Sequence, residues 1–277
     1  MRRRRLLFEA ALVGATILAL TFLLLPLVAI FLRVPFGELL SQLHSDVAID
    51  ALIVTLETNA IAQVLIVLVG TPTAYLLARR RFRGRALAIT LVELPLVLPP
   101  AVAGLALLAT FGRLGLLGGT FEALGVTVSF TKTAVVLAVA YVASPFYVRG
   151  AIAAFEALDE PLLDASRTLG AGPARTFFRV ALPLAAQGLV AAAALSIARG
   201  LGEFGATIMF AGSFQGVTQT LSLAIYAQFD LDFDVAISLG AMLVVVCAAI
   251  LLAVKLVPAW ARSSSTSIYP FAPSRSS

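Results

Sequence analysis

The chain has 277 residues, of which 60% are hydrophobic and only 13% are charged, and its formal net charge is +5. Soluble domains usually contain about 25% charged residues, so a water-soluble globule of this composition would lack the polar groups that cover a surface. The single cysteine excludes an internal disulfide, and one cysteine with one histidine argues against a protein-only zinc site or a Cys/His catalytic site.

Six apolar segments predict membrane-spanning helices, each of which needs about 20 residues. They cover residues 10–32, 51–78, 86–111, 133–150, 184–212 and 235–257. The first follows four arginines, but it is too long for the apolar part of a signal peptide, so we expect an uncleaved helix. The fold class expected is therefore all-α, a polytopic bundle of six transmembrane helices.

Three regions follow from this pattern. Residues 1–48 hold a basic segment and the first helix, residues 49–258 form a five-helix core, and residues 259–277 are rich in serine and proline. The last region lacks apolar periodicity, and we expect it to be a disordered tail.

The positions of lysine and arginine predict the orientation. With the N-terminus inside the cell, the cluster at residues 79–85, the arginines of the fourth loop and the C-terminal basic residues all fall on the cytoplasmic side. Both termini are therefore predicted to be cytoplasmic, in the inner cell membrane. Because the basic residues lie at the ends of apolar segments, we expect contact with lipid and no nucleic-acid partner.

The longest polar stretch between the predicted helices covers residues 153–182 on the cytoplasmic side. Pro161 suits the first turn of one short helix, Gly170 and Gly172 would end it, and Pro173 suits the start of a second. The first helix would be amphipathic. From the residues alone it has three possible roles: lying on lipid, docking in a groove of a partner, or packing on its own helices.

This stretch resembles the EAA loop of ABC-importer permeases, whose pattern is E-A-A, three residues, G, nine residues, then I-x-L-P. The chain matches the spacing throughout, with Asp for Glu, Ser for Ala and Val for Ile. The resemblance implies a type I ABC importer permease fold and a coupling helix that inserts into a separate ATPase subunit. The coupling residues it implies are Leu162, Asp164, Ala165, Ser166, Gly170, Gly172, Val180, Leu182 and Pro183.

The fifth apolar segment contains charges. Arg199 and Glu203 are four residues apart and would share one helix face, which Ser196 and Thr207 extend. Charges at membrane depth cost about 2.5 kcal/mol or more each unless they are paired, buried in the bundle or in contact with water. The pair would therefore either lock two helices together or line a path for a solute.

Prolines interrupt the third segment. Pro95, Pro99 and Pro100 remove amide donors and kink the helix. Broken backbone at membrane depth is tolerated only where it is buried in protein or wet, so the kink would serve packing or border a path. The run LPLVLPP is similar to one in oxyanion permeases, a family in which the gate is built from the helices corresponding to the third and fifth here.

The sequence GLGEFGATIMFAG after Arg199, with TQTLSLAIYAQF further on, resembles the signature of molybdate and tungstate permease subunits. The resemblance implies a non-enzymatic pore subunit that pairs with a second copy of itself, two copies of an ATPase and an extracytoplasmic oxyanion-binding protein. The chain has no phosphate-binding loop motif, so ATP and Mg²⁺ would be used by the partner, and no cofactor, metal or catalytic residue is expected here.

Four alternatives remain at this point. A sulfate or thiosulfate permease has a related motif. A secondary transporter would work without ATP and a structural membrane scaffold would transport nothing, and the matched spacing of the EAA-like loop argues against both. An intramembrane enzyme would need a catalytic constellation, and we find no H-E-x-x-H motif, no paired aspartates in the membrane segments and no Ser–His pair.

Overall fold

The computed structural model describes residues 2–35, 37, 41 and 44–263, and in this part of the chain the only regular secondary structure is helical. The long helices are α1 (Arg2–Arg33), α3 (Asp46–Arg79), α7 (Lys132–Glu156), α10 (Leu182–Leu201) and α13 (Phe233–Ser263). Shorter helices are α4 (Arg85–Val97), α5 (Pro100–Phe111), α6 (Gly118–Ala123), α8 (Glu160–Thr168), α9 (Pro173–Thr176), α11 (Gly205–Ala211) and α12 (Leu221–Phe229).

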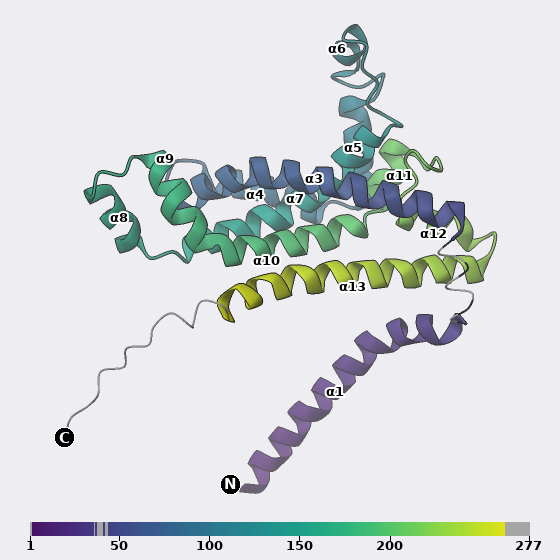
Figure 1. Cartoon of the computed structure of the whole chain (residues 1–277), viewed down its shortest axis with the longest axis horizontal. Coiled ribbons are helices and arrows are strands. Elements are labelled where there is room, and N and C mark those ends of the chain that lie inside the picture. The colour runs from purple at the N-terminus through teal and green to yellow at the C-terminus, as the bar shows by residue number, and fades with distance from the viewer. Residues whose placement is uncertain (1, 36, 38–40, 42–43, 264–277) are drawn as a thin grey trace.

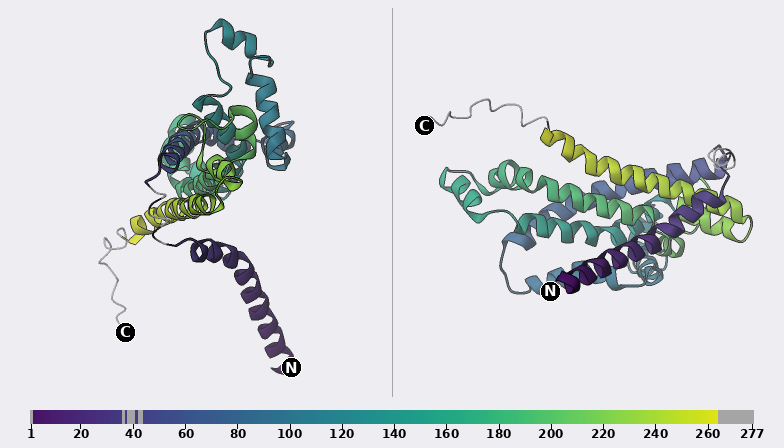
Figure 2. Two further views of the ribbon diagram at one scale, coloured as in Figure 1. Left: turned by 90° about the vertical axis from the view of Figure 1, so that its right-hand side faces the viewer. Right: turned by 90° about the horizontal axis from the view of Figure 1, so that it is seen from below.

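Among the described residues, five single helices are long and apolar enough to cross a membrane, and the bent pair α4–α5 makes up to six spans. The expected all-α membrane bundle is confirmed. The prolines do more than kink the third segment, because α4 and α5 meet at an angle of 112°. As a result, α5 diverges from α4 and packs against α11 and α7, while α6 projects from the bundle (Figures 1 and 2).

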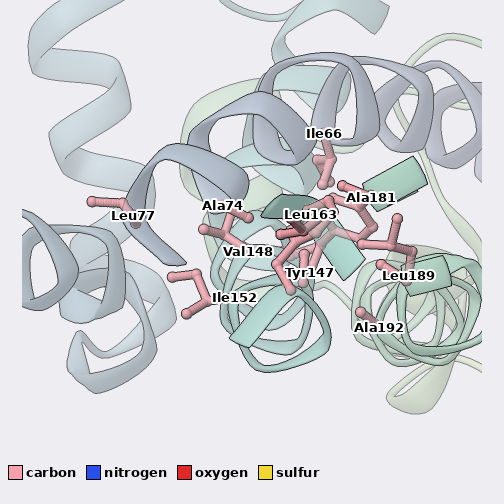
Figure 3. Packing of buried hydrophobic residues seen from close by; sticks show 14 residues of the cluster. Ile66, Ala74, Leu77, Tyr147, Val148, Ile152, Leu163, Ala181, Leu189 and Ala192 are labelled. Atoms are coloured by element: carbon pink, nitrogen blue, oxygen red, sulfur yellow. The ribbon is translucent and has the colours of Figure 1, made fainter. Parts of the chain in front are cut away.

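The core of the bundle consists of α3, α7 and α10, which lie side by side (Figure 1). Tyr147, Leu189 and Ile66 are buried in the same cluster and come from these three helices (Figure 3). Small residues let α7 and α10 approach closely: a Cβ built on Gly150 would lie 2.6 Å from the Cβ of Ala192. Close approach through small residues is the usual way in which membrane helices pack.

Arginines tie the helices together at the end of the bundle that carries α8. The Arg85 guanidinium lies 2.5 Å from the Glu156 carboxylate and also donates to the carbonyl of Leu77. Arg79 donates to the carbonyl of Leu158. These contacts join the ends of α3, α4 and α7, so the arginine cluster also has a packing role that the charge pattern did not predict.

Helix α1 lies apart from the bundle and contacts α13 (Figures 1 and 2). None of the residues in its most apolar window is buried. Because an apolar helix in this position needs an apolar solvent, its exposure fits a lipid environment.

Two boundaries differ from the sequence-based expectation. The predicted fifth segment, residues 184–212, is not one helix, because the chain leaves the helix between α10 and α11. The predicted tail begins too early, since α13 extends to Ser263, and residues 264–277 lie outside the described part of the chain.

Candidate functional site

The predicted coupling loop folds as its proline and glycine positions indicate. Pro161 lies in the first turn of α8, Pro173 begins α9, and Gly170 between them has φ +82°. A positive φ is strained for residues with a Cβ, so a glycine is favoured at this turn. Local sequence signals are therefore sufficient to place α8, which we call the lever.

One face of α8 is fastened to the bundle. Leu163 is 3% exposed and belongs to the core cluster (Figure 3), and the hydroxyls of Ser166 and Thr176 are 3.1 Å apart. Thr176 is itself buried. Leu163 and Thr176 were not among the predicted site residues; an apolar residue at helical spacing from Ser166 was the available signal.

The other face of α8 is exposed. Leu162, Ala165 and Leu169 are exposed and follow the spacing of one helix face, and Leu169 is 87% exposed. Asp164 and Arg167 form an exposed ion pair with an N–O distance of 3.0 Å. An apolar stripe with a charged pair beside it is suited to docking in a groove of another protein.

The remaining predicted coupling residues connect the lever to the membrane. Gly172 caps α9, Val180 and Leu182 pack against the core cluster, and Pro183 lies in the first turn of α10. Residues 177–181 form a π-helical turn that joins α9 to α10 without a gap. Because α8 is fastened to this continuous element, a displacement of α8 would act directly on α10.

In the membrane region, the two broken helices meet at their breaks. A Cβ on Gly205, the first residue of α11, would lie 2.6 Å from the Cβ of Pro100, the first residue of α5. A Cβ on Gly104 would lie 2.6 Å from the carbonyl oxygen of Ala206. The glycines thus allow α5 and α11 to touch backbone to backbone.

A cavity of about 120 Å³ lies beside this contact. Three of the predicted path residues, Pro95, Pro100 and Arg199, line it. The other lining residues are Leu96, Leu98, Ala103, Val142 and Phe146. Apart from Arg199 the lining side chains are apolar, so its guanidinium is the one charged group in the lining.

Arg199 and Glu203 form the expected ion pair, with an N–O distance of 2.7 Å. The prediction that they share the face of one helix is wrong, because Glu203 lies in the break after α10. Its side chain is 1% exposed, and its other oxygen accepts a 2.7 Å hydrogen bond from the backbone N–H of Ala206 in the first turn of α11. A carboxylate at a helix N-terminus is favourable, so Glu203 stabilises both the break and the arginine.

The other predicted path residues have different surroundings. Ser196 is fully buried and donates to the carbonyl of Ala143 on α7, which is a packing contact. Thr207 is also buried, and its hydroxyl has no hydrogen-bond partner among the described residues. Pro99 precedes α5 as its cap residue. None of these three lines the cavity, and their role in a path stays a prediction.

Comparison with known proteins defines the class. Residues 66–262 match the family of binding-protein-dependent transport system inner membrane components, and the chain belongs to that family. It is a multi-pass membrane protein of the permease type. The chain is 44% identical to the molybdenum transport system permease protein ModB of Mycobacterium tuberculosis, over 86% of this chain and 90% of that one. It is 34% identical to the probable transport system permease protein NifC of Clostridium pasteurianum, over 87% and 85%.

Solved structures show the same fold. A chain of a bacterial alginate ABC transporter aligns with a TM-score of 0.74 at 18% identity, over 91% of this chain and 93% of that one. A chain of the MetNI methionine ABC transporter aligns with a TM-score of 0.60 at 19% identity, over 76% and 94%. The type I importer architecture expected from the sequence agrees with these likenesses.

Proposed function

We propose that this chain is the pore-forming subunit of an ATP-driven importer that moves molybdate, or the similar tungstate, into the cell. The observation that supports this best is the Arg199 cavity between two broken helices, because a guanidinium in its lining can donate hydrogen bonds to an anion at membrane depth. The relatives that are 44% identical are molybdenum transport system permease proteins, which favours molybdate as the anion.

In this proposal two copies of the chain form the pore, and both termini are cytoplasmic. An extracytoplasmic binding protein delivers the anion to the outer side. The exposed stripe of α8 docks in an ATPase subunit, one for each copy, and that partner binds ATP and Mg²⁺. Nucleotide binding shifts the population between inward-open and outward-open states through its different contacts with α8 in each state.

The test is uptake into proteoliposomes that contain the chain, its ATPase and its binding protein. We expect molybdate to accumulate only with ATP, and a large excess of sulfate to compete poorly. Competition by sulfate at concentrations comparable to molybdate would instead assign a sulfate or thiosulfate permease. Accumulation without ATP would assign a secondary transporter and overturn the proposal.

A further inference from the structure

A second arginine lies along the same face of the bundle as the Arg199 cavity. Arg149 on α7 lines a larger cavity of about 580 Å³, whose walls are otherwise apolar or small residues of α4, α7 and α10. Leu96 and Phe146 line both cavities, so the two are neighbours. Neither the sequence motifs nor the coupling loop accounts for Arg149.

The exposure of Arg149 argues that its guanidinium meets water. It lies seven residues before the end of α7 at Glu156, which is about 10 Å at the rise of an α-helix. α7 has 25 residues and is longer than the roughly 30 Å core of a bilayer, so Arg149 is expected near the cytoplasmic edge of that core. Its side chain is 70% exposed. A charged group so exposed at this level is tolerated where it contacts water, and the cavity that it lines is the water-accessible space beside it.

The spacing of the two arginines follows from the packing of α7 against α10. These helices are antiparallel, and Gly150 is level with Ala192. Arg149 is therefore nearly level with residue 193, six residues from Arg199, which corresponds to about 9 Å along the bundle. Arg149 is the one nearer to α8.

The two arginines differ in the length of their ion pairs and in the exposure of the carboxylates that they contact. Arg199 lies 2.7 Å from a carboxylate that is 1% exposed, whereas Arg149 lies 3.4 Å from the Glu93 carboxylate, which is 36% exposed. A charge-assisted hydrogen bond is typically about 2.7–2.9 Å long, so the second pair is loose. A guanidinium presents several donors in a plane that matches the edge of a tetrahedral oxyanion.

We propose that Arg149 is a second binding station for the divalent tetrahedral oxyanion, on the cytoplasmic side of the Arg199 cavity, and that Glu93 occupies it between transport events. This inference rests on the proposed function. An anion that leaves the Arg199 cavity displaces the Glu93 carboxylate from Arg149, and the carboxylate returns when the anion departs.

The experiment compares variants in the proteoliposome assay with ATPase and binding protein present. Arg149→Gln should lower the maximal rate of molybdate uptake about tenfold, because a charge–charge contact at an intermediate dielectric constant is worth at least that factor. The half-saturating concentration of binding protein should not change. Arg149→Lys should give an intermediate rate, since the charge remains but the planar set of donors is lost.

The Glu93→Gln variant distinguishes an anion-binding role of Arg149 from a role in which the Arg149–Glu93 pair only holds the helices together. It breaks the same contact but keeps the cation, so uptake should stay near the wild-type rate. Arg5→Gln, which breaks the exposed Arg5–Glu9 pair on α1, is the matched control and should have no effect. If Arg149→Gln does not insert into the membrane, the uptake rate of Glu93→Gln is the deciding measurement, and a loss of uptake in that variant would mean that the ion pair is structural.

Equal losses for Arg149→Gln and Glu93→Gln, or a wild-type rate for Arg149→Gln, would overturn the station and leave the proposed function intact. Failure of the wild-type assembly to import molybdate would overturn both.

Discussion

The α8 lever and the Arg199 cavity represent two ways of building a functional region. The lever is exposed, and short-range signals set its shape: a proline in its first turn, Gly170 at positive φ, and a second proline at the next helix. The cavity lies between helices and depends on contacts between segments about 100 residues apart in the sequence, such as Gly104 with Ala206. Changes in the lever should therefore affect coupling while the protein stays folded, whereas changes at the cavity should affect stability and transport together.

The largest effect is expected from Arg199→Leu. It leaves the Glu203 carboxylate, 1% exposed, without its counter-charge, and breaking a buried pair in this way costs about 3–5 kcal/mol. Thermal unfolding in detergent and uptake in proteoliposomes should both show severe loss.

The double variant Arg199→Leu/Glu203→Gln is the control. The amide oxygen of the glutamine still accepts from Ala206, so stability should largely return. Uptake should not return, because the cavity has lost its cation. Recovery of uptake in the double variant would mean that the pair serves only packing.

A smaller loss is expected where α5 touches α11. A methyl group on Gly104 would meet the Ala206 carbonyl at 2.6 Å, and such overpacking costs about 1–3 kcal/mol. Gly104→Ala should lower the unfolding temperature and the uptake rate together. Gly240→Ala on α13, where no atom lies within 4 Å of the added Cβ, should not be destabilising. Equal effects of the two substitutions would show that the close contact is unimportant.

Gly170→Val should separate coupling from folding. The residue has φ +82° and no atom within 4 Å of an added Cβ, so the cost is backbone strain of about 1–2 kcal/mol or more, confined to the turn after α8. We expect normal insertion and ATP hydrolysis but fewer molybdate ions imported per ATP. Gly125→Val, at a similar φ of +70° and also in open space, tests strain away from the lever. Gly125→Val should leave the number of molybdate ions imported per ATP unchanged. A wild-type number of ions per ATP in Gly170→Val would contradict the role of the turn after α8.

The smallest effect on stability is expected from Leu162→Asp. Leu162 is 49% exposed, so the fold should be unaffected while co-purification with the ATPase is lost. The neighbouring Leu163→Asp is the matched opposite, because Leu163 is 3% exposed and its replacement should unfold the end of the bundle. Retained ATPase binding in Leu162→Asp would exclude the exposed face of α8 as the docking surface.

The same contrast explains how much the sequence could predict. Apolar length was enough for the spans, and proline and glycine positions were enough for α8 and α9. The break between α10 and α11 was not predicted, because the segment was interpreted as one helix through its charges and glycines, whereas Glu203 lies in the break and caps α11. The burial of Ser196 against α7 was equally invisible, since it depends on which helix packs on that face.

The most direct test of the account is whether the cavity opens to one side of the membrane at a time. Leu98 lines it, and Leu98→Cys in a Cys247→Ser background gives a single thiol there. A water-soluble, membrane-impermeant thiol reagent should label this cysteine from one side without nucleotide and from the opposite side when the ATPase is trapped with ATP. Labelling from the same side in both states, or from neither side in either state, would contradict a transport path at the meeting point of the two broken helices.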